Sequence, residues 1–314
     1  MLSAEQKAKL AAHAKDNAMP GFTARPFVPG MVLLVDGDYL AYYCAGNDDT
    51  EPHMAWSNLI DRLDRAKLMS GADIVVIHLS TYDCDKGLRF LVSDSPTSKP
   101  YQGQRNTGRK PKNWAYLRER MDTYEGVHFQ VVQWKDREAD DGMAMAAEFA
   151  VRRGDPVAIL TADKDMRMFA GTHMVWKTFQ MVDVPLNAYD VFAHGKQYGH
   201  KWFWMQMLMG DTADNIVGLP RVGEVAAEKA LAGTTNNWQA FCTVLDMYKS
   251  KMKDAYTDHF VEQATLLWMR TGASATLLDW MPALGLDWGT DVRRAAERMV
   301  QRVNNHIGNP RNAR

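Results

Sequence analysis

Two short runs of acidic residues constrain this 314-residue chain more than any other feature. Glu138, Asp140 and Asp141 stand almost side by side, and Asp163 and Asp165 follow downstream. Each run comes after an apolar stretch that predicts a buried strand. Crowded ionised carboxylates repel one another, and the crowding is unfavourable unless a cation neutralises it. The pattern therefore predicts a site for a hard, oxygen-binding metal, Mg²⁺ or Mn²⁺, where strands end.

Further acidic residues fall at comparable places along the chain. Asp36 ends one apolar run, and Asp83 and Asp85 follow another; which of these two faces the site stays open. Asp211 and Asp214 are three residues apart, so we expect them on one face of a helix. Each residue alone has an ordinary explanation as a helix cap or a partner of the helix dipole. Together, the acid groups favour two divalent ions about 4 Å apart.

The net charge of −1 conceals a strong segregation of charge. Residues 86–120 hold nine basic side chains against two acidic ones. A basic, aromatic-containing stretch beside an acid cluster suits a polyanion that is held by its phosphates. No apolar run approaches the length of a membrane helix, and the first residues lack the apolar core of a signal peptide. Three scattered cysteines argue against structural zinc, so we expect a cytoplasmic protein.

Apolar runs alternate with helical patterns and predict an α/β fold, a mostly parallel central sheet flanked by helices with the carboxylates at one edge. The expected strands cover residues 31–35, 74–79, 127–134, 157–160 and 174–179, and the expected helices 39–46, 54–70, 113–124 and 138–153. Residues 1–30 form an N-terminal extension with a helix from Ser3 to Lys15. Residues 31–195 form the core, and residues 196–314 a helical region with helices at 202–209 and 224–232.

The segment GLPRVG, residues 218–223, has the pattern of a helix-hairpin-helix connection. Two glycines flank a short turn before a helix, which would expose backbone N–H groups to a phosphate. The residues expected to contact DNA here are Gly218, Arg221, Val222 and Gly223. The alternative is an ordinary connection between two helices.

Six motifs in a fixed order make the chain recognisable. They are VDGD (35–38), DKG (85–87), PYQGQR (100–105), EADD (138–141), TADKD (161–165) and GDTADNIVGLPRVG (210–223). With these motifs the chain resembles the phage 5′→3′ exonuclease and flap endonuclease family, which is related to the 5′-nuclease domain of bacterial DNA polymerase I. The resemblance covers roughly residues 31–233.

The resemblance implies a divalent-metal-dependent 5′→3′ exonuclease or 5′ flap endonuclease that hydrolyses DNA phosphodiesters, with two Mg²⁺ or Mn²⁺ ions. One ion would lower the pKa of a water, and the other would stabilise the leaving 3′ oxygen. The implied metal ligands are Asp36, Asp85, Glu138, Asp140, Asp141, Asp163, Asp165, Asp211 and Asp214. Residues of about 210–233 would form a helix–three-turn–helix element, which in the family often holds K⁺. We expect a monomer of phage origin in the host cytoplasm, acting on DNA with a free 5′ end or flap; cleavage of RNA in RNA–DNA hybrids stays open.

The basic stretch, about 86–120, lies where the family has an arch with a lysine and an arginine near the scissile phosphate. Arg105 matches the arginine, but Gln102 occupies the place of the lysine. Lys86, Lys99 and Lys110 are the candidates to compensate. The expected catalytic residues are Arg105, Lys86 and Tyr101, of which Tyr101 could stack on an unpaired base. The expected phosphate-binding residues of this stretch are Lys99, Arg105, Arg109, Lys110 and Lys112.

Three alternatives remain open at this point. VDGD also resembles the opening motif of haloacid dehalogenase-type phosphatases, in which Asp36 would attack phosphorus and Asp38 would act as the acid. That interpretation leaves EADD and GLPRVG unexplained. The second alternative is a non-catalytic, structure-specific DNA-binding protein, and the third is a PIN-type RNase.

Overall fold

The computed structural model describes residues 24–93, 98–107 and 109–309, so the helix expected between Ser3 and Lys15 lies outside the described residues. Six strands form the central sheet, in the order β3-β2-β1-β4-β5-β6. Their bounds are β1 Val32–Asp36, β2 Ile74–Ser80, β3 Gln130–Trp134, β4 Val157–Thr161, β5 Gly171–Val175 and β6 Met181–Val184. Neighbouring strands are parallel except for β6, which pairs antiparallel with β5.

The centre of the sheet consists of β1 and β4, whose apolar side chains are almost entirely buried. Such runs suit a parallel strand covered on both faces. Val35 of β1 lies opposite Leu160 of β4, so the two strands end side by side. The residues that follow, Asp36 and the turn after Thr161, therefore meet at one edge of the sheet.

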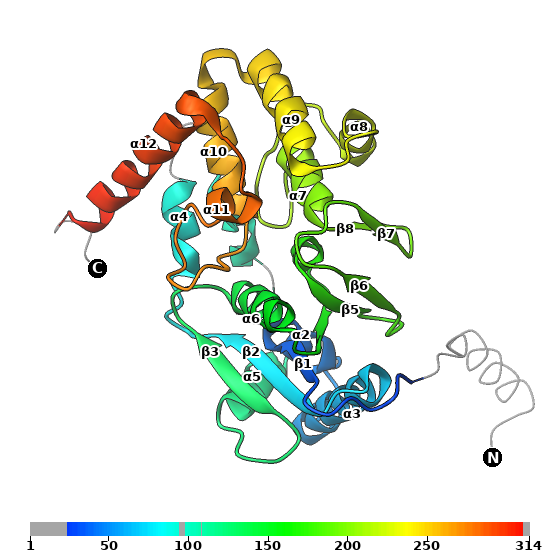
Figure 1. The fold of residues 1–314 in the computed structure, drawn as a ribbon. Coiled ribbons are helices and arrows are strands. Elements are labelled where there is room, and N and C mark those ends of the chain that lie inside the picture. The colour runs from blue at the N-terminus through cyan, green and yellow to red at the C-terminus, as the bar shows by residue number, and fades with distance from the viewer. Residues whose placement is uncertain (1–23, 94–97, 108, 310–314) are drawn as a thin grey trace, which may run out of the picture.

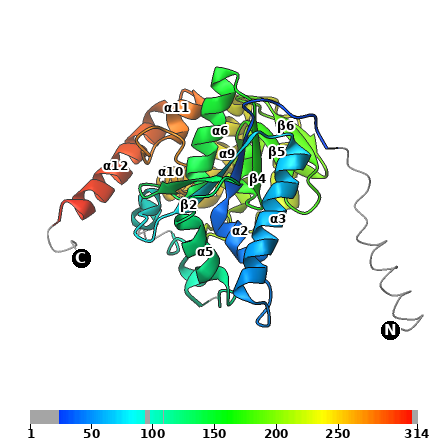
Figure 2. The ribbon, with the colours of Figure 1, turned by 90° about the horizontal axis from the view of Figure 1, so that it is seen from below.

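Helices cover both faces of the sheet. On one face lie α2 (Gly37–Cys44), α3 (Pro52–Ser70) and α5 (Trp114–Asp122), and on the other lies α6 (Ala139–Arg153), as Figure 2 shows. Helix α6 can approach the sheet closely because Gly142 has no side chain; a Cβ there would lie 2.1 Å from the Trp134 ring. Gly154 ends α6 with a left-handed φ of 77°.

Beyond the sheet the chain forms a helical part, at the top of Figure 1. Its helices are α7 (His200–Met209), α8 (Glu224–Ala230), α9 (Asn237–Met252), α10 (Tyr256–Leu267), α11 (Trp280–Leu284) and α12 (Gly289–Ile307). Large buried side chains, Trp204, Trp268 and Trp280 among them, belong to the same apolar cluster as Met143 of α6. The helical part therefore packs onto the α6 side of the sheet through a continuous core. In the described ranges, no helix is both long and apolar enough to span a membrane.

Short elements complete the chain. They are the 3₁₀ turns η1 (Lys86–Leu88), η2 (Gly103–Thr107), η3 (Asp165–Met168) and η4 (Lys253–Ala255), the helix α4 (Arg89–Val92), and a two-stranded ribbon of β7 (Val191–Ala193) and β8 (Lys196–Tyr198). Helix α4 packs against α10 and α12 of the helical part.

Two sequence-based expectations are wrong. The strand expected at 174–179 is instead β5 at Gly171–Val175, and residues 176–178 form the turn into β6; Phe179 has a left-handed φ of 57°, which a strand cannot contain. The helix expected around Asp211 is a turn closed by an antiparallel bridge between Asp211 and Ile216. It cannot be a helix because Gly210 and Gly218, both with positive φ, pack backbone against backbone at its base.

Candidate metal centre

Six carboxylates form two groups of three at the carboxyl edge of the sheet. The members are Glu138, Asp140 and Asp141 at the start of α6, and Asp165, Asp211 and Asp214 from η3 and the turn after α7; within each group, one oxygen of every member lies within 4.8 Å of the others. These acids come from segments far apart in the sequence. They follow β3, β4 and α7, and the fold brings the three segments together.

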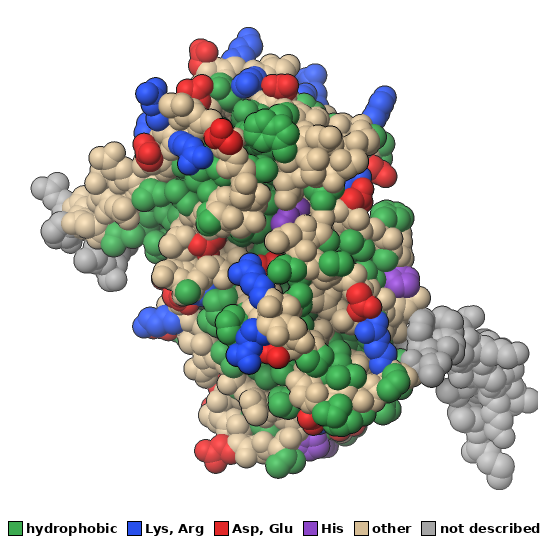
Figure 3. Space-filling model, viewed as in Figure 1, with side chains coloured by type: hydrophobic (Ala, Val, Ile, Leu, Met, Phe, Trp, Pro, Cys, Tyr) green, Lys and Arg blue, Asp and Glu red, His purple; other side chains and the backbone are tan. Residues whose placement is uncertain are grey.

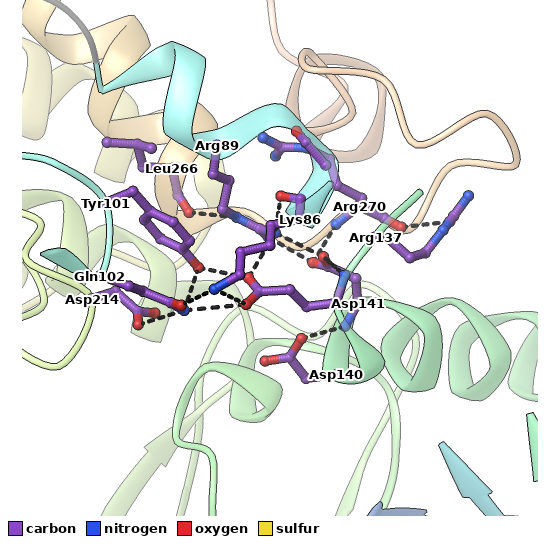
Figure 4. Close-up of polar contacts among 12 residues, drawn as sticks. Lys86, Arg89, Tyr101, Gln102, Arg137, Asp140, Asp141, Asp214, Leu266 and Arg270 are labelled. Atoms are coloured by element: carbon purple, nitrogen blue, oxygen red, sulfur yellow. Dashed lines mark hydrogen bonds and ion pairs between the residues drawn. The ribbon is translucent and has the colours of Figure 1, made fainter. Parts of the chain in front are cut away.

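In the first group, Asp141 is fully buried and accepts four hydrogen bonds. Arg89 donates to both carboxylate oxygens at 2.6 and 2.7 Å, the backbone N–H of Arg270 donates at 2.8 Å, and that of Glu138 at 3.0 Å. Figure 4 shows Arg89 and Arg270 converging on this side chain. Although burial opposes ionisation, the Arg89 guanidinium holds the pKa of Asp141 below its usual value. These four bonds fix the start of α6 and hold the Asp141 carboxylate in the same group as Glu138 and Asp140, where it stays a predicted metal ligand.

Glu138 and Asp140 are freer. Glu138 accepts from the Tyr101 hydroxyl at 2.8 Å and from the Gln102 amide at 3.2 Å. Asp140 accepts only from the backbone N–H of Asp141 among the contacts of the described residues. Burial, followed by the charges of Asp141 and Glu138, raises the pKa of Asp140 well above its usual value. A bound cation would relieve that repulsion.

The second group combines buried acids with neighbouring cations. The Lys164 ammonium contacts Asp211 and lies 3.7 Å from Asp165. Gln206 donates to Asp165 at 2.6 Å. Asp214 forms an ion pair with Arg105. Burial still raises the pKa of Asp165 well above its usual value, so these contacts do not offset the crowding of negative charge.

Asp36 and Asp163 connect with these groups electrostatically. Asp36 accepts from the backbone N–H of Tyr39 and the Thr161 hydroxyl, both at 3.0 Å. Burial raises its pKa to about 7, and the charges of Asp38 and Asp163 add to the effect. The Asp163 charge also raises the pKa of both Asp140 and Asp165, so Asp163 is close enough to act on both groups.

The other acids of the sequence prediction lie apart from the groups. Asp85 accepts from the N–H of Gly87 at 2.9 Å, within its own turn. Asp83 is exposed and pairs with Lys135 at 2.6 Å. Neither Asp83 nor Asp85 therefore belongs to one of the two carboxylate groups found among the described residues. Asp38 accepts from the backbone N–H and the hydroxyl of Ser80 and forms an ion pair with Arg118.

Gln102 bridges the two carboxylate groups. Its buried amide nitrogen donates to Glu138 at 3.2 Å and to Asp214 at 3.1 Å, and its oxygen accepts from the Lys86 ammonium at 2.5 Å (Figure 4). Lys86 also lies 3.8 Å from Glu138. Lys86 and Leu88 both have left-handed φ values, 54° and 60°, and such strain in non-glycine residues is concentrated at functional sites. Lys86 therefore brings a cation to the place beside Gln102.

Arg89 is the functional residue that the sequence analysis missed. Its guanidinium also donates to the carbonyls of Leu266 and Trp268, so it connects α6 with the end of α10. One signal was available: Arg89 stands inside the apolar run Leu88-Arg89-Phe90-Leu91-Val92. If such a run is buried in the core, a charged residue inside it must be buried too, and a buried charge needs a partner of opposite charge.

The cations predicted to bind phosphates have different surroundings. Lys99 is exposed, and Arg105 is about half exposed and pairs with Asp214 of the second group. Arg109 pairs with Asp48 at 3.2 Å, and Lys112 donates to the Asp48 carbonyl at 3.1 Å. Lys110 lies 3.5 Å above the centre of the Trp114 ring. In Figure 3, lysine and arginine side chains lie next to acidic ones near the middle of the molecule, between the helical part and the sheet.

The segment 218–223 is only partly available to a ligand. Gly218 is buried; its N–H donates to the Gln263 side chain at 2.9 Å, and its carbonyl accepts from His259 at 3.0 Å. That N–H therefore cannot grip a phosphate as expected. Arg221 and Gly223 are exposed at the start of α8, so any phosphate contact here falls to them rather than to Gly218.

The residues present fit a hard divalent metal. Every donor is a carboxylate oxygen, which is the ligand type that Mg²⁺ and Mn²⁺ prefer. Burial and mutual repulsion raise the pKa of Glu138, Asp140, Asp165 and Asp214 in the protein alone, which is the condition that a bound cation reverses.

Comparison with known proteins gives sequence relatives among bacterial DNA polymerases I. The chain is 25% identical over 253 residues to the thermostable enzyme of Thermus aquaticus, covering 76% of this chain and 28% of that protein. It is 26% identical over 175 residues to the enzyme of Bacillus subtilis, covering 54% and 19%. The chain thus spans less than a third of the length of these relatives. No protein-family model matches it.

Among solved structures, the flap endonuclease of bacteriophage T5 with DNA and metal ions aligns with a TM-score of 0.56 at 14% identity, covering 87% of this chain and 99% of that one. The T5 5′-exonuclease with bound zinc aligns with a TM-score of 0.55 at 16% identity and the same coverage. At these identities the alignments establish a common fold. The predicted fold class is confirmed, and so is the resemblance that the motifs indicated.

Proposed function

We propose that this chain is a divalent-metal-dependent 5′ nuclease that hydrolyses phosphodiesters of DNA. The observation that carries the proposal is the pair of carboxylate groups joined by Gln102, with Lys86 and Arg105 beside them. Acids alone would suit any metal-binding protein. Acids together with cations that reach the same place suit the transfer of an anionic phosphoryl group.

The ligands in this proposal come from both groups. Glu138, Asp140, Asp141 and Asp163 would hold one ion, and Asp165, Asp211 and Asp214 would hold the second; Mg²⁺ or Mn²⁺ is the proposed metal. When bound, such ions supply electrostatic stabilisation of the phosphate and lower the pKa of a water. We include Asp36 and Asp85 as more distant contributors, and a K⁺ near residues 210–233 as a further expectation.

The side chains around the carboxylates have defined roles. Arg105 and Lys86 would stabilise the charge that develops on the phosphate. Tyr101 donates to Glu138 and thereby orients it; stacking of its ring on a base stays a prediction. Asp141, held by Arg89, keeps the start of α6 in place. The substrate in this proposal is DNA with a free 5′ end or a 5′ flap, bound by a monomer, and RNA–DNA hybrids are a second substrate to test.

The phosphatase alternative is not favoured by the surroundings of Asp38. Its carboxylate is paired with Arg118 and bonded to Ser80. An acid that must give a proton to a leaving group needs access to it. The Asp38→Asn variant separates the two functions, because near-inactivation would favour the phosphatase.

Two measurements test the proposal. The first is product analysis with a 5′-labelled duplex and a matched 5′-flap DNA, in Mg²⁺ and in EDTA, for the wild type, Asp163→Ala and the exposed control Asp83→Asn. We expect Mg²⁺-dependent release of mononucleotides or short 5′ fragments, lost in Asp163→Ala and kept in Asp83→Asn. The second is thermal unfolding against Mg²⁺ concentration, where binding to the folded state raises the Tm. DNA binding without cleavage in either metal would overturn the catalytic part.

A further inference from the structure

A second charged cavity lies beside the carboxylates. Its volume is about 390 Å³, within the range of about 300–1,000 Å³ usual for small-ligand sites. The wall is formed by the end of β4, the start of the β5–β6 turn and β8. The residues that matter here are Asp163, Arg167, Trp176, Lys177, Lys196 and Tyr198. Asp163 is common to this cavity and the candidate metal centre.

Three cations from three different elements line this cavity. Arg167 comes from η3, Lys177 from the β5–β6 turn and Lys196 from β8. Arg167 lies 5.1 Å from the centre of the Trp202 ring, and within the described residues none of the three lies within 4.0 Å of a carboxylate. Burial and the charges of Arg167 and Lys177 lower the pKa of Lys196, which shows that the three positive charges are close enough to repel one another. Such a group favours an anion between its members.

Aromatic side chains form another part of the cavity wall. Trp176 is 95% buried, and its indole N–H has no hydrogen-bond acceptor in the structure. Because this nitrogen is itself inaccessible to solvent, the side chain contributes its ring to the cavity wall and not its N–H. The neighbouring rings of Tyr39 and Tyr198 add flat apolar surface.

The geometry points to this cavity as a phosphate subsite that holds a DNA strand as it passes the carboxylates. The inference rests on the proposed function for the identity of the ligand. Lys177 and Lys196 are exposed, so they can contact a phosphate of a polymer rather than only an enclosed ion. Asp163 at the same wall repels a phosphate until a cation neutralises it, so the contact becomes stronger when the metal centre is filled.

The test is DNA binding by the Lys177→Gln/Lys196→Gln variant, measured as fluorescence anisotropy of a labelled 5′-flap DNA in EDTA over a range of salt concentrations. Each phosphate contact contributes about 0.9 to the slope of log K against log[salt]. We expect the slope to fall by about 1–2 and the Kd at 0.1 M salt to rise by about tenfold or more. The matched control is Lys67→Gln/Arg294→Gln, which removes the same charge outside the cavity and should leave the slope unchanged. Unchanged thermal unfolding of both variants shows that they fold.

An unchanged slope in the cavity variant overturns the inference. A free phosphate is the other possible source of the ligand, and binding of a 5′-mononucleotide to both variants separates it. Loss of mononucleotide binding with an unchanged DNA slope would assign the cavity to the product and likewise overturn the inference. Because binding in EDTA needs no cleavage, the result is independent of whether the chain proves to be a nuclease. A changed slope in an inactive protein would leave the subsite in place and reject only the catalysis.

Discussion

Replacing Arg89 with methionine should destabilise the protein strongly, because it leaves a buried charge without its partner. Asp141 has no exposed surface, and Arg89 is its only charged partner within 4.0 Å among the described residues. Breaking a buried ion pair on one side typically costs about 3–5 kcal/mol. The carbonyls of Leu266 and Trp268 also lose a donor, so the upper part of that range is expected.

The assay is chemical denaturation of Arg89→Met, of Asp141→Asn and of the double variant. The double variant should lose less than the sum of the single ones, since Asn no longer carries the charge that Arg89 neutralises. Arg298→Met is the control, because Arg298 pairs with Asp258 at 2.6 Å where both side chains are more than half exposed, and such a pair contributes less than about 1 kcal/mol.

A loss in Arg89→Met no larger than that of Arg298→Met would refute the reasoning. It would mean that the two backbone N–H groups hold the Asp141 carboxylate without help. Additive single and double losses would refute it equally, since they would show that Arg89 and Asp141 act independently. If the reasoning holds, cleavage should also fall, because Glu138 and Asp140 lose the anchor of their helix.

Three further results are expected. Gly218→Ala should destabilise the protein by more than about 2 kcal/mol and abolish duplex binding, since its Cβ would lie 2.2 Å from a backbone nitrogen. The control Gly223→Ala, which has open space around its Cβ, should unfold as the wild type does. Equal unfolding curves for the two variants would contradict this prediction. His78→Gln should gain stability relative to the wild type as the pH drops from 6.5 towards 4, because burial lowers the pKa of His78 to about 4 and the unfolded wild-type chain takes up that proton first. The difference between the two proteins should change by up to about 1.4 kcal/mol per pH unit, and parallel stability curves would show that His78 is not involved. Lys86→Met should reduce the cleavage rate at least about tenfold, equivalent to about 1.4 kcal/mol of activation free energy. Adding Gln102→Lys to this variant should restore part of the rate. If the double variant folds and binds metal but stays slow, the position of the cation matters as much as its charge.

The central strands of the sheet could be predicted from the sequence because each one is recognisable from its own residues. Runs such as Val32–Val35 and Val157–Leu160 are apolar throughout, and a buried parallel strand requires that composition. The strand at Gly171–Val175 was misplaced because a glycine and a histidine interrupt its pattern, while the apolar residues continue into the turn. Hydrophobicity alone does not separate a strand from a buried turn.

Most acids of the candidate site were found for a similar local reason, since Asp36, Glu138, Asp140, Asp141, Asp163 and Asp165 follow a strand or open a helix. Their partners were not. Arg89 and Arg270 are brought to Asp141 by the packing of α4 and α10, and no spacing in the sequence encodes that contact. The turn at Asp211–Ile216 was mistaken for a helix because the two positive-φ glycines that prevent it act through a contact with each other.

The backbone bond from Arg270 to Asp141 has a consequence for how the protein is made. Asp141 fixes the first turn of α6, yet its partner follows 129 residues later in the chain. A ribosome that adds about 5–20 residues per second needs several seconds to cover that distance. During this time the acids of α6 exist without the segment after α10 that holds Asp141. Whatever chemistry the acids perform is therefore withheld until that segment has left the ribosome.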